Sequence, residues 1–470
     1  MKYIVIKYYY NIDYNMHIYL FHRDLRLNDN TTLIKQLKIH KKIVPIFIFP
    51  PEQIDQNKNK YFSNASVQFM IESLHELSDT IKNKDGKLYF FKGENLKVLQ
   101  AIHKEKPIES IGFNIDYTPY SVKRDNEIKN WCNDNNIICY YNEDYALYDI
   151  IDGQTKKQDG FPYLVYSPFM HHCINNLTVR PIDKFSKFKF AKVNLDKHII
   201  EESEIDKFYI DNPNINVHGG RKNGLKILKN MDKFKDYDKK RDYLTYNTTF
   251  LSAHNHFSTV SIREVHNSMI KKTGLIRELI WRDFYYNIIY YFPNIMTKKI
   301  YKDKYIKWEN NPTYFKAFCT ARTGFPLIDA ATNQLLTKNF VHNRMRMCQA
   351  SFLTKHLLID WKKGEQFYAN HLVDYSPIQN LMGWLWASSL GPDPVPYFRI
   401  FNPWIQSKKY DKDAEYIKTY LPELKDVPAK DIHKWYDPDV RNKWINKVDY
   451  CEPIVIHEVQ RKKALKLFKS

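Results

Sequence analysis

The sequence predicts an α/β domain with a doubly wound parallel sheet, followed by a larger all-α domain. Three observations lead to this prediction. Short apolar runs alternate with amphipathic stretches over the first third of the chain. Helical periodicity dominates beyond residue 225. Glycine and proline punctuate polar sequence between these two parts, and 470 residues are ample for two or three domains.

Five apolar or β-branched runs predict the strands of the sheet. Helices are expected between them, notably over 66–82 and 121–130. Residues 1–15 precede the first strand and are interpreted as an extension, which places the α/β domain at 16–149. The sheet is Rossmann-like, but the chain contains no GxGxxG and no GxxxxGK[ST], so the usual phosphate cradles are absent. The predicted strands are 18–21, 43–49, 88–91, 110–114 and 137–141.

The remaining chain divides into a connection and a helical domain. Periodicity weakens over 150–225, which is interpreted as an inter-domain connection. Residues 226–470 are assigned to the helical domain. Apolar residues at helical spacing predict helices over 262–269, 275–292, 326–337 and 345–361.

Composition limits the classes of function. With 72 Lys and Arg against 53 Asp and Glu, the net charge is +19, which favours a polyanionic partner. No apolar run approaches the roughly 20 residues of a membrane helix, and no signal peptide is predicted. The six cysteines form no CxxC pair, so we expect no disulfide framework, no metal site and an intracellular, reducing compartment. Nuclear, cytoplasmic and virion locations all stay open.

One candidate cluster lies on the helix predicted over 275–292. Glu278 and Trp281 are three residues apart and share a helix face, and Arg282 follows at i+4 from Glu278. A helical ion pair beside a packed tryptophan would explain this pattern. A carboxylate and a stacking ring that face one pocket would explain it equally well.

A second cluster is the segment HNRMRM at 342–347. Arg344 and Arg346 are about 200° apart on a helix, so one can meet a phosphate while the other pairs inward with a carboxylate. Asn343 and Met347 share a face, and the methionines favour a soft binding surface over a solvated charged face. Further on, a carboxylate, an amide, two tryptophans and an arginine occur within 26 residues of Asp374.

Taken together, these segments resemble the photolyase/cryptochrome flavoprotein family, and within it the class I cyclobutane pyrimidine dimer photolyases. The similarity runs from about residue 17 to about residue 435. It is carried by HRDLRLNDN at 22–30, TGFPLIDAA at 323–331, HNRMRM at 342–347, LIDW at 358–361 and YFRIFNP at 397–403.

The resemblance implies FAD bound in the helical domain, in its reduced form for activity. Hydroxyls and backbone N–H groups are expected on the phosphate side, and an ion pair and an amide beside the isoalloxazine. The implied phosphate-side residues are Tyr237, Thr248, Thr249, Phe250, Leu251 and Ser252. The implied isoalloxazine-side residues are Arg346, Asp374, Tyr375, Ser376 and Asn380. The implied electron-carrying row is Trp384, Trp361 and Trp308.

The resemblance also implies a partner, DNA that contains pyrimidine dimers, and an enzyme that splits them by light-driven electron transfer from FAD. A flipped-out dimer would be held in a pocket, and the strand would be held by backbone contacts that do not specify base sequence. The implied pocket residues are Glu278, Trp281, Asn343, Met347 and Trp386. The implied backbone-contacting residues are Arg241, Arg282, Arg344, Arg399 and Gln406.

Other members of the fold are the alternatives. A cryptochrome would use the same flavin fold for blue-light signalling, but the pocket set is complete here. A (6-4) photoproduct lyase would call for a histidine where Asn343 and Met347 stand. Ser376 replaces the second Asp that is usual in class I members, and Tyr120-Ser121 replaces an Asn-Glu pair that holds a folate antenna in some of them. A second chromophore is therefore left unassigned, and a monomer is expected.

Overall fold

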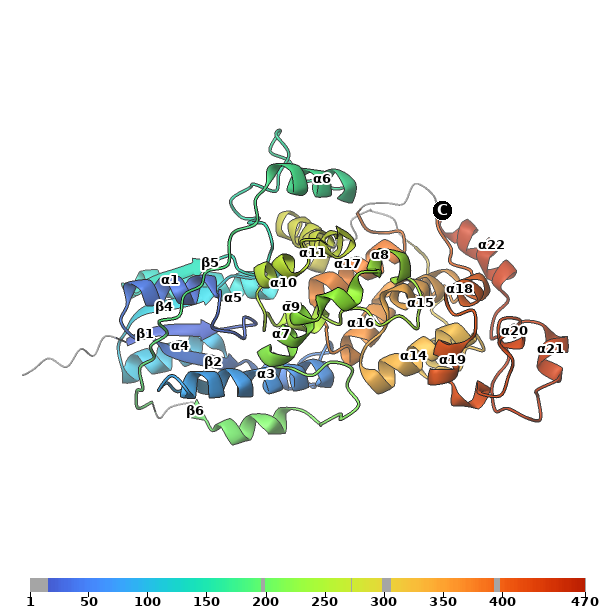
Figure 1. Ribbon diagram of the computed structural model, residues 1–470, viewed down its shortest axis with the longest axis horizontal. Helices are drawn as coiled ribbons and strands as arrows, with labels where there is room; N and C mark the ends of the chain where they lie inside the picture. The colour runs from blue at the N-terminus through green and yellow to red at the C-terminus, as the bar shows by residue number, and fades with distance from the viewer. Residues whose placement is uncertain (1–15, 196–198, 272, 298–305, 393–397, 470) are drawn as a thin grey trace, which may run out of the picture.

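The computed structural model describes residues 16–195, 199–271, 273–297, 306–392 and 398–469, so the expected extension at 1–15 lies outside the described residues. A sheet lies at one end of the molecule and a body of helices at the other (Figure 1). The predicted two-part fold is confirmed. The strands are β1 (Met16–Phe21), β2 (Val44–Phe49), β3 (Tyr89–Lys92), β4 (Ile108–Asn114), β5 (Ile138–Asn142) and β6 (Ile199–Ile200).

The sheet has the order β5-β4-β1-β2-β3-β6, with the first five strands parallel. Ile18 pairs with Val44 of β2 on one side and with Ile111 of β4 on the other, so the strand order reverses at β1. β6 is antiparallel to β3 and comes from the segment predicted as a connection. At two residues, it is too short for periodicity to reveal it.

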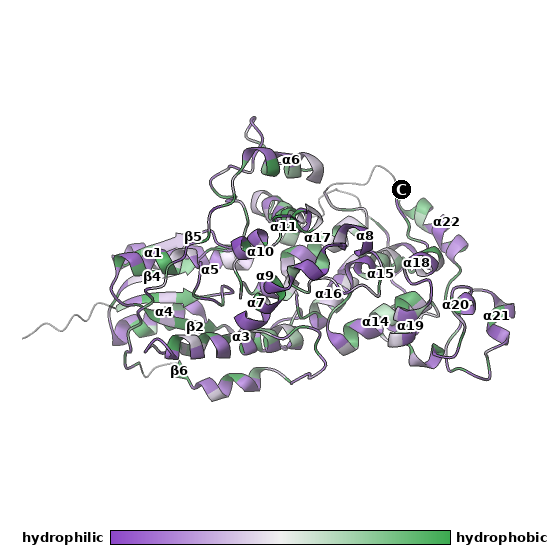
Figure 2. Ribbon diagram, in the orientation of Figure 1, coloured by the Kyte–Doolittle hydropathy of each residue, from purple (hydrophilic) through white to green (hydrophobic). Residues whose placement is uncertain are grey.

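Side chains of β1 alternate between two cores, as its pleat requires. Tyr19 and Phe21 pack with α1 (Thr31–Ile39) and α3 (Asn64–Lys82). Ile18 and Leu20 pack with α4 (Asn95–Glu105) and α5 (Pro119–Asp134) on the opposite face. Green, the hydrophobic colour, is prominent on β2, whereas α1 and α3 carry both green and purple (Figure 2).

A set of short helices links the sheet to the helical body. α6 (Tyr166–Asn176) lies beside the long helix α11 (Figure 1). The other elements of this set are η1 (Glu202–Phe208), α7 (Arg221–Lys229), η2 (Met231–Phe234) and α8 (Tyr237–Lys240). A further short helix, α2 (Pro51–Ile54), lies between β2 and α3.

The helical body shares one continuous apolar core. Its helices are α9 (Ser252–His256), α10 (Ile262–Ser268), α11 (Thr273–Tyr291), α12 (Asn294–Thr297), α13 (Pro312–Cys319), α14 (Pro326–Lys338), α15 (Asn343–Lys355), α16 (Trp361–His371), α17 (Pro377–Ala387), α18 (Pro403–Tyr410), α19 (Glu415–Tyr420), η3 (Pro422–Leu424), α20 (Ala429–Ile432), α21 (Pro438–Asn442) and α22 (His457–Leu467).

The single helix predicted over 345–361 is wrong. α15 ends at Lys355, and Leu358 has a left-handed φ of 53°. Asp360 then caps a new helix, since its side chain accepts a hydrogen bond from the N–H of Lys362. The apolar periodicity continues across this break, which is why it concealed the turn.

The loop between β1 and α1 joins the two parts of the molecule. Arg26 is fully buried, pairs with Asp144 at 2.5 Å and donates to the Ser258 carbonyl. Arg263 of α10 pairs with Asp29 at 2.7 Å and with Asp144 at 2.7 Å. Burial alone would raise the pKa of Asp144, but the two arginines hold it well below its usual range. Part of the HRDLRLNDN motif is thus a buried structural anchor.

No helix in the described part of the chain is long and apolar enough to cross a membrane. All six cysteines are free. Among the described residues, no group of three or more His, Cys, Asp or Glu side chains is placed to hold a metal ion.

Candidate functional site

Two helices bring together the ion pair that the resemblance predicts. Arg346 lies in the first turns of α15, and Asp374 lies just before α17. The Arg346 Nη2 atom donates to both carboxylate oxygens of Asp374, at 2.9 and 3.1 Å, and its Nε atom donates to the Val341 carbonyl. Since the Asp374 side chain is only 3% exposed, the pair fixes a charge at a defined point inside the helical body.

Asn380 is held by a carboxylate that the sequence analysis missed. Its Nδ2 atom donates at 3.0 Å to the backbone carbonyl and at 2.9 Å to the side chain of Glu365. Both amide hydrogens are thereby used, so Oδ1 is the atom that Asn380 can offer a ligand. Burial raises the pKa of Glu365 to about 7, against the lowering effect of Asn380. A helical spacing of four residues from Trp361 is the sequence signal that could have identified Glu365.

The residues expected on the phosphate side form a loop that leads into α9. Phe250 has a left-handed φ of 54°, which turns the backbone sharply before the buried Leu251. Thr248 and Thr249 are partly exposed, and Ser252 is exposed at the start of the helix. Tyr237 lies apart in sequence, under the Arg241 guanidinium, which is 5.9 Å from its ring centre.

The three predicted tryptophans become less buried along the row. Trp384 is 3% exposed and Trp361 is 5% exposed, whereas Trp308 is partly exposed. Gly364, one turn beyond Trp361, has no room for a Cβ because the Trp384 ring packs there. The segment after Trp308 is tied to the turn before α16, since the N–H of Glu309 donates to the Leu358 carbonyl.

Glu278 and Arg241 form a half-exposed ion pair, with Arg241 Nη1 at 2.7 Å from Glu278 Oε1. Burial raises the pKa of Glu278 above its usual range, and the adjacent arginines oppose this shift. Arg344 pairs at 2.6 Å with Asp242, the residue after Arg241. Both arginines of HNRMRM therefore pair with carboxylates, Arg344 with Asp242 and Arg346 with Asp374.

Trp281 presents only part of its surface. Tyr166 of α6 stacks on it, with ring centres 3.6 Å apart and an interplanar angle of 8°. The Tyr166 hydroxyl donates to the Arg277 carbonyl in the same helix as Trp281. One face of the indole is thus covered by protein.

Arg282 does not present a free guanidinium. Its side chain is 11% exposed and donates to the carbonyls of Tyr145 and Asn255. These two hydrogen bonds hold the backbone at Tyr145 and at Asn255 to α11. Its predicted contact with the DNA backbone stays a prediction. Arg399, assigned the same role, is exposed.

The remaining predicted residues lie on α15, α17 and α18. Asn343 is exposed at the first position of α15, and Met347 is partly buried one turn later. Gln406 accepts a hydrogen bond from the thiol of Cys348. Ser376 and Tyr375 precede α17, and Ser376 is 7% exposed. Trp386 is partly buried near the end of α17.

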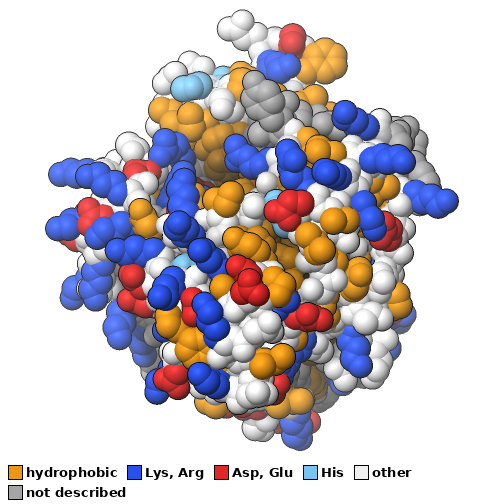
Figure 3. Space-filling model, turned by 90° about the vertical axis from the view of Figure 1, so that its right-hand side faces the viewer, with side chains coloured by type: hydrophobic (Ala, Val, Ile, Leu, Met, Phe, Trp, Pro, Cys, Tyr) orange, Lys and Arg blue, Asp and Glu red, His pale blue; other side chains and the backbone are white. Residues whose placement is uncertain are grey.

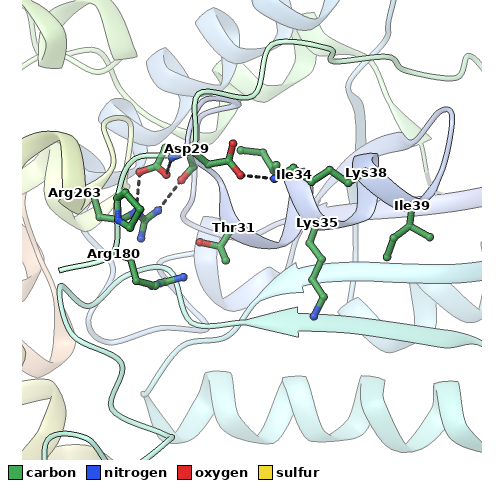
Figure 4. A pocket seen from close by; sticks show the side chains of 10 residues that line it. Asp29, Thr31, Ile34, Lys35, Lys38, Ile39, Arg180 and Arg263 are labelled. Carbon is green, nitrogen blue, oxygen red and sulfur yellow. Dashed lines mark hydrogen bonds and ion pairs between the residues drawn. The ribbon is translucent and has the colours of Figure 1, made fainter. Parts of the chain in front are cut away.

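The face of the molecule at the helical end carries a hollow with apolar side chains, and Lys and Arg side chains gather around it (Figure 3). A separate cavity lies on the α/β part, between α1 and the segment at 180–183 (Figure 4). Most of its charged groups are engaged in ion pairs, such as Arg263–Asp29 and Lys38–Asp183. None of the predicted site residues lines this second cavity.

Several buried polar atoms around the predicted flavin and dimer sites lack a partner among the described residues. They include Nε2 of His342, Nε of Arg344 and Nε1 of Trp386. Buried polar atoms are normally hydrogen-bonded, so a polar ligand here would complete the set. On the flavin side, the Arg346–Asp374 pair and the free Oδ1 of Asn380 are charged and polar groups of the kind that a heterocycle with polar edges, such as FAD, would need.

Comparisons with known proteins agree with this fit. Residues 17–186 match the family described as DNA photolyase, and residues 275–470 match the FAD binding domain of DNA photolyase. The protein is therefore a two-domain flavoprotein. A deoxyribodipyrimidine photo-lyase of Buchnera aphidicola is 33% identical, over 97% of this chain and 98% of its own length. One from Alkalihalophilus pseudofirmus is 32% identical, over 96% of this chain and 97% of its own. The chain belongs to the DNA photolyase family.

Solved structures show the same fold. The archaeal photolyase of Sulfolobus tokodaii, described with two FAD molecules, is 35% identical with a TM-score of 0.84, over 96% of this chain and 99% of its own. A class III photolyase of Agrobacterium tumefaciens is 28% identical with a TM-score of 0.87, over 97% of both chains. A cryptochrome of Synechocystis superposes with a TM-score of 0.86, but at 23% identity it shows the fold alone.

Proposed function

We propose that the protein is a deoxyribodipyrimidine photo-lyase, which uses light and reduced FAD to split cyclobutane pyrimidine dimers in DNA. The observation that supports this proposal is that one helical body holds both the predicted tryptophan row, Trp384, Trp361 and Trp308, and the predicted pocket residue Trp281. The bound flavin would supply the light-driven electron transfer. The chain's own residues would bind, orient and shield the reactants.

On the flavin side, Arg346 and Asp374 would hold the isoalloxazine, and Asn380 would present Oδ1 to its hydride-accepting nitrogen. Glu365 would fix the orientation of that amide. Thr248, Thr249, Phe250, Leu251, Ser252 and Tyr237 would contact the phosphates. Ser376 keeps a hydroxyl where class I members carry a second carboxylate, so this side of the site has one negative charge fewer.

On the substrate side, Trp281 would stack on a base through the face that Tyr166 leaves free. Glu278 and Asn343 would bond the base edges, and Met347 and Trp386 would complete the apolar walls. Arg241, Arg282, Arg344, Arg399 and Gln406 would contact the backbone. Unstacking a damaged pair costs less than unstacking an intact one, which favours dimers over normal bases.

The direct test reduces the flavin chemically and follows dimer-containing DNA under blue light at the absorbance of restored thymine. We expect recovery in light and none in darkness. Bound FAD that undergoes photoreduction without any dimer repair would contradict the proposal and favour the light-sensor alternative.

Glu278→Ala tests the pocket assignment. Because the side chain would lose its charged hydrogen bond to the substrate, dimer repair should fall roughly ten-fold, with the flavin spectrum unchanged. Asp238→Ala is the matched control, since it breaks a similarly exposed pair with Arg277, between the segment at 238–241 and α11. Loss of FAD from the Glu278 variant would place this residue in the cofactor site instead.

Lysines next to Arg241 should add salt-sensitive attraction to DNA. Lys235 and Lys239 are exposed and have no carboxylate within ion-pair distance in the described structure. Lys239→Gln should reduce the slope of log affinity against log salt by about 1. Binding titrations over a range of salt measure this slope, and Lys104→Gln on α4 should leave it unchanged.

A further inference from the structure

Lys355, the last residue of α15, is a buried ammonium whose three hydrogen-bond acceptors are all uncharged. The residue is 1% exposed. Its Nζ atom donates to the Ala387 carbonyl at 2.9 Å, to the Ser389 hydroxyl at 2.9 Å and to the Arg399 carbonyl at 2.7 Å. An ammonium has three hydrogens, so its donor capacity is filled.

A buried charge without a counter-ion is costly. Burial, with a further contribution from nearby Arg399, lowers the pKa of Lys355 to about 7. Within the described residues no carboxylate forms an ion pair with it. The three neutral acceptors are therefore what keeps this side chain in place.

The hydrogen bond from Lys355 to Ala387 gives a partner to the backbone carbonyl of the last residue of α17. The last carbonyls of a helix have no partner within the helix, and a cation there also matches the helix dipole. Ser389, two residues on, has a left-handed φ of 66°, a conformation that a side chain rarely adopts. The ammonium thus fixes a strained turn directly after the helix that carries Trp386.

The contact at Arg399 reaches a segment distant in sequence. Its backbone carbonyl faces Lys355 while its own side chain is exposed. The ring of the neighbouring Phe398 also lies 4.6 Å from the Lys355 ammonium. One side chain therefore fastens the Arg399 segment to the end of α17.

We propose that Lys355 is a positioning residue for damaged DNA: it holds Arg399 and Trp386 in fixed relation, so that one contacts the strand backbone while the other contacts the flipped-out dimer. This inference rests on the proposed function. Lys355 itself contacts neither DNA nor flavin, and it contributes to affinity rather than to the splitting reaction.

The test compares the affinity and the repair yield of Lys355→Met in the FAD-loaded protein. Affinity for a dimer-containing duplex should weaken about ten-fold, because a charged hydrogen-bond donor is lost. The repair yield of DNA-saturated enzyme, the flavin spectrum and the photoreduction rate should stay at wild-type values. Lys104→Met, which removes an exposed charge from α4, should bind damaged DNA like the wild type.

Ser389→Ala keeps the test decisive if Lys355→Met does not fold, since it removes one acceptor and leaves the lysine in place. It should weaken damaged-DNA affinity in the same direction. Unchanged affinity in the folded variants would overturn the positioning role, and so would a parallel loss of flavin, yield and affinity. Wild-type protein that repairs no dimers would overturn the proposed function itself. Failure of the proposed function can therefore be told apart from failure of the Lys355 role.

Discussion

Replacing Trp384 by phenylalanine is expected to reduce photoreduction of the oxidised flavin to the background rate. Trp384 is the most buried of the three predicted electron carriers, and phenylalanine is much harder to oxidise than tryptophan. The row would be interrupted at its inner end, so electrons from Trp361 and Trp308 could no longer pass inward. Absorbance of the flavin under blue light, with an external thiol present, measures the rate.

The same variant should still repair dimers when its flavin has been reduced chemically, because that reaction does not need the row. Trp404→Phe offers a matched control: it removes a partly buried tryptophan that stacks on Phe325 outside the row. Equal losses of photoreduction and repair in the Trp384 variant would show a packing defect near Gly364 rather than an interrupted electron path.

The sequence predicted the architecture well because periodicity records which faces are buried. All five parallel strands were located to within two residues, and the buried ones, such as β2, form continuous apolar runs. The break between α15 and α16 was missed because a left-handed residue such as Leu358 leaves no mark on hydrophobic spacing. The two-residue β6 was missed because two residues are too few to show a period.

In the candidate site, too, some residues could be identified from sequence motifs and others could not. Motif resemblance brought Arg346 and Asp374 together, and the structure places them in contact. It did not identify Tyr166, whose stacking on Trp281 is a contact between helices that no local pattern encodes. It also missed Glu365, for which the spacing from Trp361 was the only signal. It assigned Arg282 to the DNA, which stays a prediction, and it did not foresee that this side chain donates to the carbonyls of Tyr145 and Asn255.

Asp374→Ala should cause the largest loss of flavin binding. Removing one partner of a buried ion pair leaves an uncompensated charge, which typically costs 3–5 kcal/mol; about 3 kcal/mol is expected here because Arg346 is partly exposed and keeps the Val341 carbonyl. Purified variant should therefore contain little FAD, as measured by flavin absorbance per protein, and should unfold at lower denaturant. Asp413→Ala removes a carboxylate from an exposed pair with Lys412 and should change neither quantity. Full flavin content in the Asp374 variant would place the isoalloxazine away from this pair and would require a new assignment of the cofactor site.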